Sequence, residues 1–208
     1  MTIDKKTKIL DILNDYKLLG FDFLNEINCV NKIEDLVFSL PNTIEELEQY
    51  INHCSLCDNY KQKIQYSNSV GDIYSEIYIV TIEKISSKEL MDKLLSVFNT
   101  NNKVCFTPII KCEIPKTINS KSSDIAICKS YIQKQIEIVR PKYILALGDA
   151  FKLFFDNSYD IVDISGNLYN YQGIKISPVL DPSFVNKNPS YENKFEEDLV
   201  KIKSSWKI

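Results

Sequence analysis

Two cysteines with two residues between them lie in the stretch HCSLCDN, at Cys54 and Cys57. This spacing lets two thiolates reach one centre, and it is typical of metal sites and redox centres. A closed cage needs two more ligands, and the sequence contains no second pair with this spacing. The remaining ligands must therefore come from distant positions in the chain.

Four further cysteines are available for such a cage. Cys105 lies inside the apolar run KVCFT and Cys29 has no partner nearby, so we interpret both as buried structural residues. Cys112 follows a predicted strand and Cys128 falls on a predicted helix, which makes these two the candidate partners of the first pair. Four thiolates can hold zinc or an iron–sulfur cluster. Four unrelated thiols are the competing interpretation, and spacing by itself does not separate the two.

Composition places limits on the protein's partners. The chain has 208 residues, 25% charged and 44% hydrophobic, which is average for a globular domain with a sizeable core. Its net charge of −3 provides no global basic field, so any nucleic acid must bind at a local patch. No run resembles a signal peptide or a membrane span. We therefore expect a cytoplasmic protein without membrane association, in which cysteines bind metal instead of forming disulfides.

Short β-branched runs alternate with amphipathic helical segments along the chain. The predicted strands are 76–80, 103–110, 141–148 and one within 173–183, and the principal predicted helices are 86–98, 124–139 and 192–206. This alternation indicates a parallel sheet with helices on both faces. Ligands of such sheets bind beyond the carboxyl ends of the strands. We expect residues 1–42 to form an N-terminal helical extension and residues 43–208 to form the main domain.

Four segments carry a resemblance to a known family: HCSLCDNY, FTPIIKCEIP, CKSYIQKQIEIVRPKYILALGDAF and SGNLYNYQGIKISPVLDPSFVNKNP. They resemble the iron–sulfur uracil-DNA glycosylases of the family 4 type, and the run from Cys112 to Gly148 is the most specific part. The resemblance implies a 4Fe-4S cluster held by Cys54, Cys57, Cys112 and Cys128. It also implies DNA as a partner and a three-layer α/β/α sandwich around a small parallel sheet.

Base excision makes three chemical demands that can be compared with this sequence. The base must be flipped out of the helix and read by a side-chain amide, water must be positioned, and the departing uracil anion must be stabilised. The family meets these demands with a Gly-Glu-x-Pro-Gly loop, an asparagine before the third cysteine and a His-Pro-Ser motif. Here the first strand is followed by TIEKISSKELMDKLL, the asparagine is Pro108, and the histidine is Asp181.

Two functions remain open after this comparison. One is a DNA-binding member of the superfamily that lacks normal uracil excision. The other is an active DNA glycosylase of altered specificity in base excision repair, with Glu83 or Asp181 as the carboxylate that positions water. Each candidate also has a simpler interpretation, because Glu83 can be a solvated residue before a helix and Asp181 can form a turn in Asp-Pro-Ser. A redox protein is a third class, against which the absence of a flavin or nicotinamide motif argues.

Candidate DNA contacts follow the Asp-Pro-Ser segment. The family has an apolar wedge, a basic residue and a proline at this place, and the sequence reads FVNKNP. The resemblance implies that Ser183, Phe184 and Lys187 contact nucleic acid, with Val185 as a second part of the wedge. Near the cluster cysteines lies a local basic set that is a further candidate for phosphate contact and is diluted by Glu113 and Asp124: Lys111, Lys116, Lys121, Lys129 and Lys134. In a lysine-rich chain, an ordinary solvated surface is the competing interpretation.

Overall fold

The computed structural model describes residues 40–57, 59–85, 88–98, 104–115, 122–155 and 159–206. All of them belong to one unit, Leu40–Ile208. The predicted N-terminal helical extension lies outside the described residues except for 40–42, so it stays a prediction. In the described part of the chain, no helix combines the length and apolar character that crossing a bilayer requires.

A six-stranded sheet forms the centre of this unit, in the order β2-β4-β3-β6-β8-β7. Its strands are β2 (Val70–Gly71), β3 (Ile77–Thr81), β4 (Val104–Pro108), β6 (Tyr143–Leu147), β7 (Tyr169–Tyr171) and β8 (Ile174–Val179). The four inner strands are parallel, as predicted from the sequence. The outer strands β2 and β7 are antiparallel to their neighbours and were not expected, because segments of two or three residues give no readable alternation.

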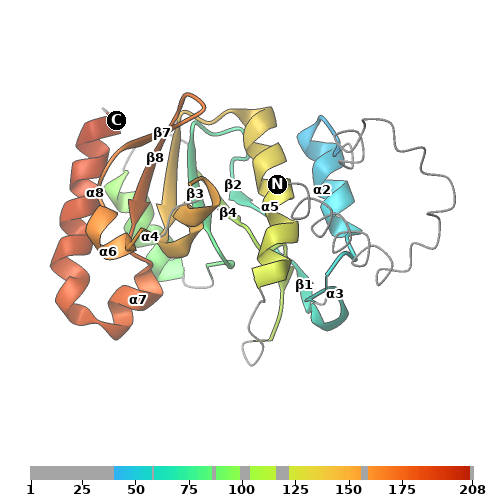
Figure 1. Ribbon diagram of the computed structural model, residues 1–208, viewed down its shortest axis with the longest axis horizontal. Coiled ribbons are helices and arrows are strands. Elements are labelled where there is room, and N and C mark those ends of the chain that lie inside the picture. Colours follow the sequence, from blue (N-terminus) through green and yellow to red (C-terminus); the bar gives the residue numbers. More distant parts are fainter. Residues whose placement is uncertain are drawn as a thin grey trace, which may run out of the picture. The chain divides into compact units, whose positions relative to one another are not determined.

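Helices cover both faces of this sheet (Figure 1). One face packs on α4 (Lys88–Val97) and α8 (Glu192–Trp206), and the other packs on α5 (Ser122–Val139). After β6 the chain forms a 3₁₀ helix, η2 (Gly148–Leu153), and α6 (Ile161–Ile164) follows it. Strands β3 and β4 are buried along their whole length. This burial on both faces accounts for their nearly continuous apolar sequences. The expected three-layer α/β/α fold is confirmed.

A further layer lies outside α5 and is formed by α2 (Ile44–Asn52). Thr43 caps α2 by accepting the N–H of Glu46, and its own hydroxyl donates to the Glu46 carboxylate. Leu47 and Ile51 of α2 pack on Tyr131 of α5. Beyond α2 come α3 (Asn59–Gln62) and a small antiparallel sheet of β1 (Gln65–Tyr66) with β5 (Cys112–Glu113). These elements bring the N-terminal cysteine pair to the α5 side of the sheet.

The carboxyl-terminal helix is anchored by one large side chain, Trp206. Its ring is fully buried and stacks on Phe98 at 5.4 Å and on Tyr143 at 4.9 Å between centroids. We expect Trp206→Ala to lower the free energy of unfolding by about 3–5 kcal/mol, because it leaves a large cavity. Urea denaturation measures the loss. Val200→Ala on the exposed face of the same helix should stay within about 0.5 kcal/mol, and equal losses would contradict this account.

Candidate metal centre and nucleic-acid interface

The four predicted ligand cysteines come from three parts of the fold. Cys54 and Cys57 lie between α2 and α3, Cys112 begins β5, and Cys128 lies on α5. The four thiols lie within electrostatic range of one another, because neighbouring thiolates contribute to raising the pKa of Cys57, Cys112 and Cys128. Cys112 and Cys128 are buried, whereas Cys54 and Cys57 are partly exposed. The structure thus brings these side chains into one neighbourhood, while their binding of a metal stays a prediction.

The chemistry of this thiol set suits a metal group. Burial, followed by the neighbouring thiols, raises the pKa of Cys112 to about 12. Burial likewise raises the pKa of Cys128 to about 11 and that of Cys57 above its ordinary value. The cause is that several thiolates would gather in a poorly solvated space. A bound metal group would neutralise the thiolates and release their protons, which is the usual exchange at cysteine sites.

Hydrogen-bond donors already surround the sulfur atoms. The Tyr131 hydroxyl donates to Cys54 Sγ at 3.1 Å. The backbone N–H groups of Asn59 and Tyr60 donate hydrogen bonds to the Cys57 thiol, and that of Lys111 donates to the Cys128 thiol. Such donors stabilise metal-bound thiolates. The sequence did contain a signal for Tyr131, because its position three residues after Cys128 places both on one face of a helix.

The spacing of these groups bears on which metal they suit. No three His, Cys, Asp or Glu side chains among the described residues are arranged to hold a single metal ion. A tetrahedral zinc site needs sulfur atoms about 3.8 Å apart, which follows from a Zn–S bond of about 2.3 Å. An iron–sulfur cluster holds its thiolates farther apart, because each binds a different iron. The cluster itself stays a prediction, which rests on the resemblance to the iron–sulfur glycosylases.

His53 is the chain's only histidine and lies beside the cysteine pair. It is the C-cap residue of α2, it is exposed, and its Nδ1 pairs with the carbonyl oxygen of Gln49 at 2.8 Å. This contact fixes the ring at the end of the helix. The structure therefore gives His53 a local role at the helix end.

Glu83, the first candidate catalytic residue, lies in the segment after β3. Its side chain is exposed, and its backbone carbonyl accepts the Thr81 hydroxyl at 2.6 Å. The same segment stays paired with the chain that leaves β4. Ile109 N donates to the Thr81 carbonyl at 2.8 Å, and Ile110 N donates to that of Ile82 at 2.9 Å. Backbone hydrogen bonds thus connect the segments that follow β3 and β4, at the sheet edge where we predicted ligand binding.

Asp181, the second candidate, is the N-cap residue of α7 (Pro182–Lys187). Its Oδ1 accepts both the N–H of Ser183, at 2.7 Å, and the Ser183 hydroxyl. Gly148 at the end of β6 lies against it, with a φ of +55°, and a Cβ there would come within 2.9 Å of Asp181 Cβ. The carboxylate therefore starts the helix, a role close to the turn-forming interpretation of Asp-Pro-Ser.

Asp181→Ala should lower the free energy of unfolding by about 1 kcal/mol, because the N–H of Ser183 loses its partner. Thermal denaturation measures this change. Asp181→Asn keeps an oxygen that can cap the helix, so it should cost only a few tenths of a kcal/mol. A loss of equal size in both variants would contradict the capping role.

The predicted DNA contacts Ser183, Phe184 and Lys187 all lie on α7, and all three are exposed. The Phe184 ring leans on that of Tyr191 at 5.3 Å between centroids and remains 38% exposed. Val185 cannot serve as a second wedge, because it is buried in the core with α8. On this helix, Phe184 is therefore the remaining candidate for the apolar wedge, and Lys187 is the candidate for the positive charge.

Two other positions singled out in the sequence are buried. Pro108 ends β4 opposite Thr81 and has no side-chain amide to present. Lys111 is only 3% exposed, and its ammonium group bonds to Thr107 and Gln135. For Lys111 the predicted phosphate contact is therefore wrong, whereas Lys116 and Lys121 lie outside the described residues and the contacts of Lys129 and Lys134 stay predictions. Lys111 directly precedes the two-residue strand β5, a segment too short to give a readable pattern of burial.

Comparison with known proteins agrees with this arrangement. A family model described as the Uracil DNA glycosylase superfamily matches residues 61–203. The Type-4 uracil-DNA glycosylase of Archaeoglobus fulgidus is 24% identical over 182 residues, which cover 77% of this chain and 92% of that protein. That of Thermotoga maritima is 33% identical over 101 residues, or 46% of this chain and 53% of that protein.

A different kind of protein is also similar to part of the chain. A DNA polymerase of Bacillus phage SP01 is 29% identical over 96 residues, which are 46% of this chain and 10% of the polymerase. The Archaeoglobus protein is thus matched over most of its own length and the polymerase over a small part of its own.

Proposed function

Since the chain belongs to the uracil-DNA glycosylase superfamily, we propose that it is a DNA-binding member with a 4Fe-4S cluster and without normal uracil excision. Cys54, Cys57, Cys112 and Cys128 would hold the cluster. The alternative is an active DNA glycosylase of altered specificity, and its support is the similarity to the Archaeoglobus glycosylase over 92% of that protein.

The cluster would act as a crosslink in this proposal. It would tie the segment between α2 and α3 to β5 and α5, which are far apart in the sequence. The proximity of the four thiols and the donors around them support this role. A crosslink that closes a long loop stabilises the folded state by reducing the entropy of the unfolded chain.

The observation that carries the lack of uracil excision is the engagement of Asp181. Its carboxylate is occupied by the backbone and hydroxyl of Ser183, at the position where the family's motif has a histidine. A negative charge there would repel a departing uracil anion instead of stabilising it. Pro108 adds to the deficit, because proline has no side-chain amide to read the base.

The DNA-binding part of the proposal rests on α7. Phe184 offers an exposed ring next to the carboxyl ends of β6 and β8, and Lys187 offers a positive charge one turn later. An apolar wedge followed by a cation is a combination that suits entry between base pairs with contact to phosphate.

One experiment separates the two functions. Full-length protein is purified anaerobically and its iron is counted. It is then incubated with a duplex that contains a single uracil and with the same duplex without it. We expect binding to both duplexes and no free uracil. Release of uracil, or of another base from a panel of damaged duplexes, would favour the active glycosylase, and absence of any DNA binding would contradict both.

Lys187→Ala should weaken binding to either duplex and reduce the slope of log K against log salt by about 0.9, the value of one phosphate contact. Lys142→Ala is the matched control, because Lys142 is exposed, precedes β6 and pairs with Glu76 at the opposite end of the strands. Fluorescence anisotropy at several salt concentrations gives both slopes. A slope unchanged by Lys187→Ala would remove this residue from the interface.

A further inference from the structure

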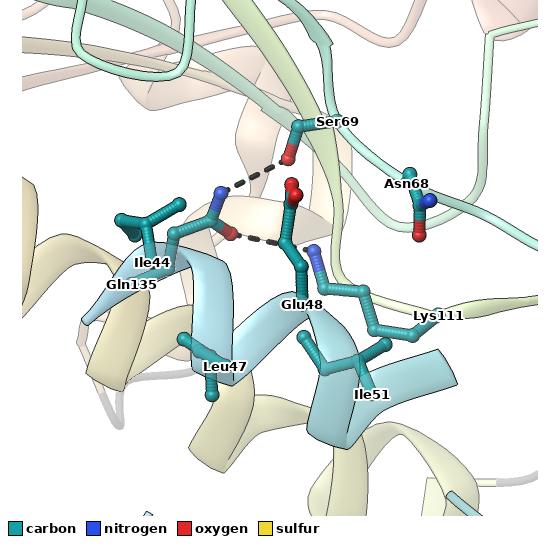
Figure 2. A pocket seen from close by; sticks show the side chains of 8 residues that line it. All are labelled: Ile44, Leu47, Glu48, Ile51, Asn68, Ser69, Lys111 and Gln135. Atoms are coloured by element: carbon teal, nitrogen blue, oxygen red, sulfur yellow. Dashed lines mark hydrogen bonds between the residues drawn. The ribbon is translucent and has the colours of Figure 1, made fainter. Parts of the chain in front are cut away.

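Lys111 is a buried lysine held in a closed ring with the side chains of Thr107, Gln135 and Ser69. Figure 2 shows Lys111, Gln135 and Ser69 of this ring. The Lys111 Nζ donates to Thr107 Oγ1 at 3.1 Å and lies 3.4 Å from Gln135 Oε1. The Gln135 amide nitrogen donates to Ser69 Oγ, and Ser69 donates to Thr107, both at 2.9 Å. Because that nitrogen is committed to Ser69, the amide oxygen must face the ammonium group. The lysine is therefore fixed in place by neutral partners.

Burying a lysine this deeply carries an energetic cost that needs a compensating negative charge. The ring around Lys111 contains no carboxylate, and the partly exposed Glu48 lines the same pocket. Lys111 directly precedes Cys112, one of the four proposed cluster ligands. Cys128, a second proposed ligand, accepts a backbone hydrogen bond from Lys111 and lies within electrostatic range of its ammonium group.

Tyr131 is the second buried group directed at the sulfur atoms. It is 1% exposed, and its hydroxyl donates to Cys54 Sγ at 3.1 Å. The ring of Tyr50 meets it edge-on at 6.1 Å between centroids, and Leu47 and Ile51 pack on it as well. The aromatic packing thus holds one hydrogen-bond donor on one sulfur.

Given the cluster of the proposed function, on which this inference rests, we propose that Lys111 and Tyr131 set its reduction potential. Lys111 acts through its fixed positive charge near Cys128, and Tyr131 acts through its hydrogen bond to Cys54. Reduction adds one negative charge to a thiolate-bound cluster. A buried cation and a donor to sulfur stabilise the reduced form more than the oxidised form. Both residues therefore make the cluster easier to reduce. Neither binds the cluster itself, and each acts through a cysteine ligand.

Spectroelectrochemistry of the full-length, iron-loaded protein under anaerobic conditions tests this assignment. One electron passes between the electrode and the cluster, and no bond forms or breaks. At a fixed potential, Lys111→Met should lower the ratio of reduced to oxidised cluster about tenfold, which is about 59 mV for a one-electron couple. Tyr131→Phe should lower this ratio about threefold. Iron per protein and the visible absorption band verify that each variant is loaded.

Two variants serve as controls. Lys111→Arg keeps the positive charge and should retain most of the wild-type ratio. Tyr50→Phe removes a hydroxyl from the ring that packs on Tyr131 and should leave the ratio unchanged. A shift as large in Tyr50→Phe as in Tyr131→Phe would overturn the role of the hydrogen bond to sulfur.

The inference and the proposed function fail in different ways. A loaded cluster whose ratio is the same in wild type, Lys111→Met and Tyr131→Phe would overturn the inference and leave the cluster in place. Wild-type protein that takes up no iron would overturn both. If Lys111→Met fails to load, Tyr131→Phe decides by itself, because it removes a single oxygen atom. An unchanged ratio in that variant would then overturn the inference.

Discussion

Replacing Cys112 by serine should abolish iron binding and lower the free energy of unfolding by about 3–5 kcal/mol, the size expected for losing a crosslink across a long loop. Serine cannot supply a thiolate to a soft metal. The cluster would close the loop between Cys57 and Cys112, so its loss frees a long stretch of chain. Iron content, the visible spectrum and anaerobic urea denaturation measure the two effects together.

Cys105→Ala is the matched control for this variant. Cys105 is also a fully buried thiol, and it lies in β4 outside the proposed ligand set. The control should keep its iron and lose far less stability than Cys112→Ser. Hydrogen exchange adds a local test, because iron removal should first expose the segment around residues 50–60. Full iron in Cys112→Ser, or unchanged exchange in that segment, would argue against the crosslink.

The wild-type protein should release uracil from DNA at least a hundred- to a thousand-fold more slowly than an active family member. One missing electrostatic donor costs about this much, and here several groups are missing together. Pro108 offers no amide, and the Asp181 carboxylate is engaged at the start of α7. The deficits should combine, because such groups act on the same developing charge.

Restoring two of these groups should recover little activity. The double variant Pro108→Asn with Asp181→His still lacks the glycine-containing loop after β3. In this chain that segment is paired with the residues after β4, and Lys84 bonds to Glu113 at 3.2 Å. Single-turnover assays on a uracil duplex measure the recovery, with Asp181→His alone as the control. Efficient excision by the double variant would locate the defect in those two side chains, and efficient excision by the wild type would favour the active glycosylase.

Several features of this protein were determined by the sequence alone, because they depend on local pattern. The inner strands are continuous apolar runs, and such runs are stable only where both faces of a sheet are covered. The pair Cys54 and Cys57 predicted a metal centre with Cys112 and Cys128, and the structure brings these four thiols into one neighbourhood, while their binding of a metal stays a prediction. The departures at Pro108 and Asp181 could likewise be read directly, since each replaces a side chain whose chemistry the reaction needs.

Other features were decided only by the tertiary structure, because burial depends on what packs against a residue from elsewhere in the chain. Lys111 and Val185 were predicted to contact DNA, and both are buried beneath neighbouring elements. Tyr131 reaches Cys54 across 77 residues of sequence, a contact that exists only once α2 has packed on α5. Asp181 and Ser183 meet because the chain turns into α7 after β8. Charge and polarity can be read from residue types, but the three-dimensional packing decides which of these groups face solvent and which face one another.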